Sequence, residues 1–303
     1  MSLVFAGIDG GQSSTVAVIG DERGRILARG RAGPADEVGA DASSTRLREA
    51  LRGALDDARR GAGLLEGSDF AAIVGGISGY DGRVYGAAPE LPSARAVLLH
   101  DAPIAHAGAL AGRAGVIAIA GTGSVVYATD ETAAARTLGG WGFLFGDEGS
   151  AFGIARDALA AMMRAQDDGD ASLAGETHAA CEFFGVPSLR ALTRAFYSGE
   201  LARDRLAAFA PAAMCSPRFG PLVDRGAGRL AELVSAAITA GAPPIVALVG
   251  GVFDDESFAA RVRAHVGAGV TGTQFVSPRY EPAEGALLLA YREGGLDVRE
   301  LLS

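Results

Sequence analysis

The sequence contains no lysine and no asparagine, so all 27 of its basic residues are arginine. Without lysine the chain cannot form a Walker A loop, in which a lysine reaches the β- and γ-phosphates of a nucleotide. Schiff-base and pyridoxal-phosphate enzymes are excluded because their chemistry needs a lysine amine. Protein kinases are excluded because they hold the ATP phosphates with a lysine on a strand.

Cysteine is also scarce. Cys181 and Cys215 lie far apart in the sequence. His178 stands three residues before Cys181, but no second ligand pair follows at the spacing of a zinc site. We therefore expect no zinc site, while the sequence leaves a disulfide open.

Long apolar runs and basic clusters are absent as well. No apolar window of 18 residues exists, and the N-terminus lacks the charged region and apolar core of a signal peptide. Acidic side chains number 36 against 27 basic ones. The chain thus lacks the excess of basic residues typical of nucleic-acid binding, and it has no basic amphipathic stretch for an anionic membrane. These features predict a soluble, cytoplasmic globular protein.

The pattern of apolar residues predicts a mixed α/β fold. With 303 residues, 49% of them hydrophobic, the chain is long enough for one large or two medium domains. A β-meander opens it, followed by a helix at Ala42–Arg60 and by two strands that we expect to be buried. The meander strands are Leu3–Ile8, Ser14–Ile19 and Arg25–Gly30, and the two later strands are Ala71–Gly75 and Arg95–His100.

The opening pattern then occurs a second time. Strands at Gly115–Ala120 and Val125–Thr129 flank a glycine turn, with a third short strand at Arg136–Leu138. This repetition suggests an internal duplication with a domain boundary within Gly108–Gly115. Beyond it we expect a mostly helical segment, a strand and two helices. These elements are Gly149–Ala240, Ile245–Val249, Glu256–Val266 and Glu281–Glu293.

Two glycine turns have the composition of phosphate-binding loops. They are Asp9–Ser13 and Gly121–Ser124, and each lies between two strands. Glycines let backbone N–H groups approach phosphate oxygens, a hydroxyl adds a donor, and Asp9 is able to hold Mg²⁺. A third turn, Gly250-Gly251, follows a strand and is placed to pass under an adenine or its ribose. The alternative is that the first two are ordinary hairpin turns and the third ends a βα unit.

Two further segments carry candidate side chains. Asp101 follows the strand Arg95–His100, where α/β proteins place ligand-contacting groups, and as a general base it could accept a hydroxyl proton. It could instead, or in addition, cap the helix that follows. The segment Gly139–Ser150 combines the only tryptophan with glycines and two adjacent carboxylates, a composition typical of sugar recognition. The alternative is a core tryptophan with Asp147 or Glu148 at a helix N-terminus.

Taken in order, these motifs resemble the N-acetylglucosamine kinase family. The resemblance rests on the Asp-Gly-Gly hairpin, the strand-end Asp-Ala, Gly-Thr-Gly-Ser, the Gly139–Ser150 block, the late Gly-Gly and the C-terminal Glu-Gly-Ala-Leu-Leu-Leu. This family lies within the actin-like ATPase and sugar kinase superfamily. It is related to the activator ATPases of acyl-CoA dehydratases and benzoyl-CoA reductases.

The resemblance implies two ribonuclease-H-like domains with ATP, Mg²⁺ and an amino sugar meeting in an interdomain cleft. The first domain would comprise residues 1–112 with a C-terminal helix at 282–303, and the second, enlarged by helices, residues 113–281. The implied ATP- and phosphate-binding residues are Asp9, Gly10, Gly11, Ser13, Gly121, Thr122, Gly123, Gly250 and Gly251, with Asp9 also the metal ligand. The implied sugar-binding residues are Asp36, Asp101, Gly140, Trp141 and Asp147, with Asp101 the catalytic base.

The chain departs from the family pattern in two places. Its first loop, Gly10–Ser14, lacks the basic residue that often follows that loop. The sugar-contacting asparagine of the family is replaced by Asp36, which as an anion only accepts hydrogen bonds. The expected activity is phosphorylation of the 6-hydroxyl of N-acetylglucosamine, with glucosamine as the rival substrate. An ATPase activator of a dehydratase and a non-catalytic sugar sensor are the alternatives of other classes, and a homodimer is left open.

Overall fold

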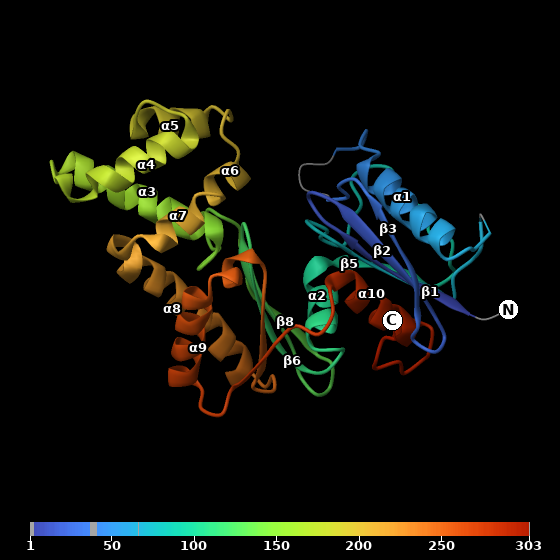
Figure 1. Ribbon diagram of the computed structural model, residues 1–303. Helices are drawn as coiled ribbons and strands as arrows, with labels where there is room; N and C mark the ends of the chain where they lie inside the picture. Colours follow the sequence, from blue (N-terminus) through green and yellow to red (C-terminus); the bar gives the residue numbers. More distant parts are fainter. Residues whose placement is uncertain (1–2, 37–40, 66, 303) are drawn as a thin grey trace. The chain divides into compact units, whose positions relative to one another are not determined.

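The computed structural model describes residues 3–36, 41–65 and 67–302 (Figure 1). The chain divides into two compact units, the first formed by Met1–Ala114 with Ser277–Ser303 and the second by Gly115–Val276. Compared with the domains expected from the sequence, residues 113–114 and 277–281 belong to the first unit rather than to the second.

The first unit contains a five-stranded mixed sheet with the order β3-β2-β1-β4-β5. The pairs β1–β2 and β2–β3 are antiparallel, whereas β1–β4 and β4–β5 are parallel. Parallel strands end at the same edge, so the carboxyl ends of β1, β4 and β5 lie at one edge of the sheet. The strands are β1 (Val4–Gly10), β2 (Thr15–Asp21), β3 (Ile26–Ala32), β4 (Ala72–Ile77) and β5 (Ala96–His100).

Helices cover both faces of this sheet. On one face lies α1 (Arg46–Gly61), whose Leu47, Leu51 and Leu55 recur at helical spacing and are buried. On the other face lie α2 (Asp101–Ala109) and α10 (Pro282–Glu293), which pack on each other and on β4 (Figure 1). In this way the last helix of the chain completes the core of the first unit.

The second unit repeats the same sheet. Its order is β10-β9-β6-β7-β8, with antiparallel pairs β6–β7 and β7–β8 and parallel pairs β6–β9 and β9–β10. Both sheets therefore have a central strand with a hairpin on one side and parallel strands on the other, which confirms the expected repeat. The strands are β6 (Gly115–Ala120), β7 (Ser124–Thr129), β8 (Ala135–Gly139), β9 (Ile245–Val249) and β10 (Gln274–Val276).

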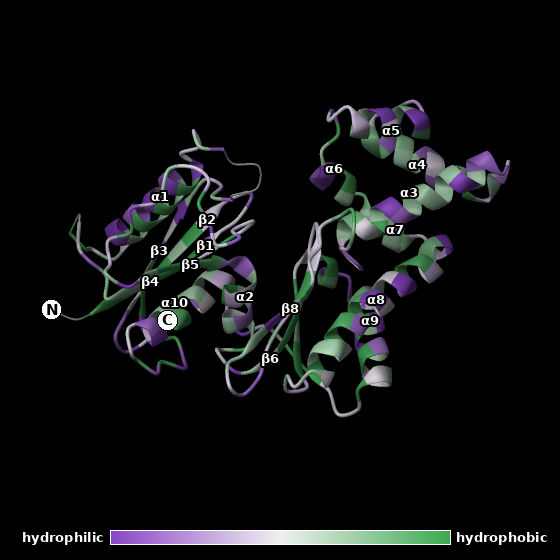
Figure 2. Ribbon diagram, turned by 180° about the vertical axis from the view of Figure 1, so that it is seen from behind, coloured by the Kyte–Doolittle hydropathy of each residue, from purple (hydrophilic) through white to green (hydrophobic). Residues whose placement is uncertain are grey.

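The helical segment enlarges the second unit, as the sequence predicts. The long helix α8 packs on β6, β7 and α9, while α3 packs on α4, α6, α7 and α8. In Figure 2 the strands are mostly in the hydrophobic colours, and the helices carry both colours because one side of each faces the core. The helices are α3 (Ala151–Asp167), α4 (Ala174–Phe184), α5 (Leu189–Tyr197), α6 (Arg203–Ala207), α7 (Ala210–Cys215), α8 (Gly220–Thr239) and α9 (Glu256–Gly269).

Several expectations are corrected by the structure. The strand β5 is not buried, because it is the outer strand of its sheet and pairs only with β4. The strand β10 was not expected, since three residues carry too little pattern to be distinguished from a loop. The first helix begins at Arg46 rather than at residue 42.

The structure also answers whether the cysteines form a disulfide and whether a described helix could cross a membrane. Cys181 is half-buried, Cys215 is exposed, and both thiols are free, so the two do not form a disulfide. Among the helices that the structure describes, none combines the length and apolar composition needed to cross a bilayer.

Candidate functional site

The hairpin between β1 and β2 presents the first glycine turn at the carboxyl edge of the sheet. Asp9 and Gly10 are the last residues of β1, and the N–H of Gly11 donates to the carbonyl of Ser14 over 3.0 Å. Gly10 is required for packing, since a Cβ there would lie 2.7 Å from Cδ1 of Ile77. The side chain of Ser13 is exposed at the tip. The turn is therefore a hairpin, as expected, with its backbone open to a ligand.

Asp9 is the most perturbed carboxyl group of this edge. Burial, together with the negative charges of Asp101 and then of Glu281, raises the pKa of Asp9 from 3.8 to about 6. The carboxylates of Asp101, next to the end of β5, and of Glu281, at the start of α10, thus repel that of Asp9, and a cation would relieve this repulsion. Asp9 alone was predicted as a metal ligand, and the charge environment fits a hydrated Mg²⁺, which needs only one or two carboxylates in addition to phosphate oxygens.

Asp101 lies at the first position of α2, at the end of β5. The N-cap of α2 is His100, so the expectation that Asp101 caps this helix is wrong. The side chain of Asp101 is about 37% exposed and its Oδ1 lies 2.7 Å from Nδ1 of His100. An exposed carboxylate at this edge has the access to a ligand that a general base needs.

Asp36 reaches the same edge from the segment after β3. The N–H of Ala35 donates to the carbonyl of Gly11 over 3.0 Å, which ties this segment to the first hairpin. The Asp36 side chain is buried, and its Oδ1 lies 3.6 Å from the guanidinium of Arg46 at the start of α1. The negative charge of Asp36 is therefore offset by a neighbouring arginine.

In the second unit the hairpin between β6 and β7 is fixed to the start of α3. The N–H groups of Ala151 and Phe152 donate to the carbonyls of Gly121 and Thr122 over 2.9 and 3.2 Å. The Thr122 side chain is exposed at the tip of the turn. Since the first N–H groups of α3 already donate within the protein, the exposed side chain of Thr122 is the polar group of this turn that faces solvent.

The third glycine turn lies next to the second. Gly250 has φ of +107°, and a Cβ there would lie 2.5 Å from the carbonyl oxygen of Ala120, at the end of β6. Only glycine fits this approach. Gly251 opens the short 3₁₀ turn Gly251–Asp254. The strand ends of β6 and β9 therefore place the second and third glycine turns side by side.

Asp147 is engaged by protein groups rather than left open. One of its oxygens accepts from the N–H of Ser124 at 3.1 Å, and the other pairs with the guanidinium of Arg203 at 2.8 Å. The side chain is buried, and Asp147 has φ of +61°. In the structure this carboxylate holds the segment Gly139–Ser150, called the tryptophan loop below, against β7 and α6. The sugar contact expected of Asp147 stays a prediction.

The tip of the tryptophan loop is exposed to solvent. Trp141 is 75% exposed, so the alternative of a tryptophan buried in the core is wrong. Gly140 has φ of +70°, which a residue with a side chain rarely adopts. Neither Asp147 nor Glu148 caps α3, since Ser150 accepts from the N–H of Gly153 at 3.0 Å.

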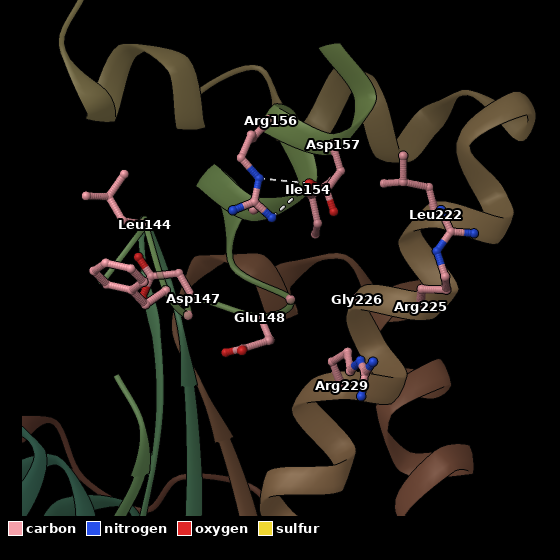
Figure 3. A pocket seen from close by; sticks show the side chains of 14 residues that line it. Leu144, Asp147, Glu148, Ile154, Arg156, Asp157, Leu222, Arg225, Gly226 and Arg229 are labelled. Carbon is pink, nitrogen blue, oxygen red and sulfur yellow. Dashed lines mark hydrogen bonds and ion pairs between the residues drawn. The ribbon is translucent and has the colours of Figure 1, made fainter. Parts of the chain in front are cut away.

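A pocket of about 440 Å³ lies between this loop, α3 and α8 (Figure 3). Glu148 extends into it from the loop, while Arg225 and Arg229 line it from α8. Oε2 of Glu148 is buried without a hydrogen-bond partner in the structure. The pocket is within the usual size range for small-molecule sites, and its lining combines Arg156, Arg225 and Arg229 with the carboxylates of Asp147, Glu148 and Asp157.

The structure thus gathers the predicted residues into two groups. In the first unit, the first hairpin, Asp36 and Asp101 share one sheet edge, and in the second unit the two glycine turns lie beside the tryptophan loop. Sequence analysis missed His100, Glu281 and Arg203. The pairing of Glu281 with Glu284 in a capping box was detectable from spacing, but the partnership of Arg203 with Asp147 spans 56 residues and left no local signal.

Comparison with known proteins gives a family match over nearly the whole chain. The model of the BadF/BadG/BcrA/BcrD ATPase family matches residues 6–290. The N-acetylmuramic acid/N-acetylglucosamine kinase of Clostridium acetobutylicum is 39% identical over 71 residues, which is 23% of each chain. The N-acetyl-D-glucosamine kinase of Dictyostelium discoideum is 29% identical over 179 residues, 54% of this chain and 55% of the relative. The matched segments thus span about a quarter and about half of these relatives' lengths.

Solved structures resemble the chain along its full length. A candidate N-acetylglucosamine kinase from Chromobacterium violaceum is 26% identical with a TM-score of 0.76, covering 95% of this chain and 99% of that chain. A second candidate from Porphyromonas gingivalis is 18% identical with a TM-score of 0.67, covering 98% and 100%. The ROK hexokinase of Thermus thermophilus, 20% identical, has a TM-score of 0.56 and covers 96% and 99%. The last two similarities, at 18% and 20% identity, show only that the fold is shared.

Proposed function

The chain belongs to the BadF/BadG/BcrA/BcrD ATPase family, and from this premise we propose that it is an ATP-dependent kinase acting on the 6-hydroxyl of an amino sugar, N-acetylglucosamine. The observation that carries the proposal is the exposed carboxylate of Asp101 at the same sheet edge as the Asp9 hairpin. The similarity to kinases of N-acetylglucosamine supports the class of substrate.

Phosphate binding is assigned to backbone groups and hydroxyls, because the chain has no lysine. The N–H groups of the turn at Gly10–Ser13 and the Ser13 hydroxyl would hold the γ-phosphate from the first unit. The turn at Gly121–Gly123 and the Thr122 hydroxyl would hold phosphates from the second unit. Mg²⁺, when bound, would neutralise phosphate charge, and Asp9 is the residue placed to hold it, directly or through water.

Asp101 would act on the nucleophile. Its free carboxylate oxygen would accept the proton of the 6-hydroxyl as that oxygen forms a bond to the γ-phosphorus and the bond to the β-phosphate oxygen breaks. ADP and the sugar phosphate are the products.

The pocket beside the tryptophan loop is proposed to receive part of the nucleotide. It borders the start of α3, which is hydrogen-bonded to the second glycine turn, so a nucleotide with phosphates at that turn could extend into it. Arg225 and Arg229 supply positive charge along α8. Gly250 and Gly251 would pass close to the adenosine on the neighbouring side.

Asp36 and Trp141 are proposed to recognise the sugar. An exposed indole suits the apolar face of a pyranose ring, and Asp36 accepts hydrogen bonds from a hydroxyl or an amide N–H. Because Arg46 offsets the charge of Asp36, the site does not need a cationic amine to balance it. This favours N-acetylglucosamine over glucosamine.

The proposal is tested by ADP release with ATP and a panel of hexoses and hexosamines. We expect turnover with N-acetylglucosamine and a loss of about 10²–10⁴ in kcat for Asp101→Asn, the usual contribution of a general base. Asp167→Asn, a carboxylate of α3 that is 70% exposed and lies outside the pocket, serves as the matched control and should keep the wild-type rate. Full activity of folded Asp101→Asn would remove the base assignment, and turnover without any sugar would favour an ATPase.

A further inference from the structure

The side chain next to the proposed base makes a short contact with it. His100 ends β5 and Asp101 begins α2, and Nδ1 of His100 lies 2.7 Å from Oδ1 of Asp101. Both side chains are partly exposed, at about 47% and 37%. Within the described part of the chain, no other basic side chain forms an ion pair with Asp101.

The direction of this hydrogen bond follows from the two atoms involved. A carboxylate oxygen only accepts, so a contact of 2.7 Å requires a proton on Nδ1 of His100. The same nitrogen lies 3.3 Å from the backbone nitrogen of Ala102, where it would have to accept. One protonated nitrogen cannot do both, and the shorter, charge-assisted contact is the stronger one. His100 therefore donates to Asp101.

We propose that His100 is a positioning residue that holds Oδ1 of Asp101 and leaves Oδ2 to accept the proton of the sugar hydroxyl. The inference rests on the proposed kinase function. In this role the imidazole keeps its own proton, while the proton of the hydroxyl moves to Oδ2 of Asp101 as the phosphoryl group is transferred. The orientation of a carboxylate matters because small misplacements of a reacting group reduce rates strongly.

The charges around the pair give His100 a second effect. The negative charge of Asp101 acts on Asp9, so the pair lies close to a further carboxylate. The hydrogen bond to Asp101 is the first cause of a raised pKa of His100, opposed by burial. A protonated imidazole at this place adds positive charge beside these carboxylates.

Kinetics of three variants separate positioning from a general structural effect. Asn places an amide donor near the position of Nδ1, so His100→Asn should keep kcat within about threefold, whereas His100→Ala should lose about 10–100-fold, the range typical of groups that orient functional residues. The KM for ATP should change little in either variant. His178→Asn, an exposed histidine paired with Glu182 on α4, is the control and should match wild type. Equal losses in the Asn and Ala variants, or none in Ala, would overturn the proposal.

Proton NMR of the imidazoles tests the pairing without any substrate. We expect the titration midpoint of His100 to fall toward 6.5 in Asp101→Asn, because the hydrogen bond to Asp101 is the main cause that raises its pKa. An unchanged midpoint would overturn the pairing. If the midpoint moves but wild-type protein phosphorylates no hexosamine, the proposed kinase function is wrong and the role of His100 in it is lost too, while the pairing itself stands.

Discussion

At the scale of single residues, the carboxylates at the edge of the first sheet decide the chemistry. Burial, and then the negative charges of Asp101 and Glu281, raise the pKa of Asp9 to about 6. An arrangement that is unfavourable in the unliganded protein is common where a cation or a reacting group is to be bound. The free-energy cost of this arrangement should be measurable as a lower free energy of unfolding.

Asp9→Asn is therefore expected to stabilise the unliganded protein at neutral pH. Because the folded-state pKa of Asp9 lies above its usual 3.8, the folded state binds the proton more tightly. The stability that this proton contributes is complete below pH 3.8 and is lost as the pH rises toward 6. Removing the carboxylate should thus gain up to about 3 kcal/mol at pH 7.5, from the size of the shift, and little at pH 4. Urea unfolding without Mg²⁺ measures this difference.

Asp57→Asn is the matched control, because the pKa of Asp57 is lowered in the folded protein whereas that of Asp9 is raised. A backbone N–H of Arg31 and then Arg60 lower the pKa of Asp57, so its removal should give no gain at neutral pH. If Asp9→Asn shows no pH-dependent gain relative to wild type, then burial and the neighbouring charges do not raise the pKa of Asp9 in solution.

Arg46 offers a test of substrate choice. Arg46→Leu removes the guanidinium that offsets Asp36, so the ratio of kcat/KM for glucosamine to that for N-acetylglucosamine should increase on the order of tenfold. Arg52→Leu, on the same helix and paired with Asp56 at 3.6 Å, should leave the ratio unchanged. An unchanged ratio in Arg46→Leu would mean that Asp36 does not face the amino group of the sugar.

At the scale of elements, the strands that carry the glycine turns were predictable and the loop contacts were not. Apolar runs located β1, β6 and β9 within two residues, because each is an inner strand of its sheet. The outer strand β5 was wrongly expected to be buried, since its sequence is as apolar as that of an inner strand. The tryptophan loop was recognised from composition, yet its anchor Arg203 lies on α6 and was not.

The anchor of the tryptophan loop should contribute measurably to stability. Arg203→Ala leaves the buried carboxylate of Asp147 without its charged partner and should cost about 1–3 kcal/mol. Arg190→Ala, whose side chain is 84% exposed and 3.7 Å from Asp167, should change stability by less than about 0.5 kcal/mol. Thermal unfolding of the two variants compares them, and equal small effects would show that the pair does not hold the loop.

The face of α8 that lines the pocket gives a test of nucleotide binding. Reversing charge in the double variant Arg225→Glu with Arg229→Glu should raise the KM for ATP about tenfold or more, with the KM for the sugar little changed. Arg194→Glu, an exposed position on α5 outside the pocket, is the control. A raised KM for the sugar alone would instead assign the pocket to the sugar.

At the scale of the whole molecule, the same five-stranded sheet occurs in both units. The repetition was visible in the sequence because the strand, glycine turn and strand recur with similar residues. Each unit has one glycine hairpin turn that we propose to contact phosphates, and the proposed metal ligand Asp9 and the proposed base Asp101 both lie in the first unit. The resemblance to the kinase family assigned the roles of these residues, since no spacing within one sequence could relate residues of one unit to those of the other.

The central claim is transfer of the γ-phosphoryl group of ATP to the 6-hydroxyl of an amino sugar. It is tested most directly by phosphorus–proton correlation NMR of the product formed from ATP, Mg²⁺ and N-acetylglucosamine. We predict a phosphorus signal coupled to the two protons on C6, with one ADP formed per sugar phosphate. Phosphorus coupled to the proton of another carbon, or release of inorganic phosphate with the sugar unchanged, would contradict the account.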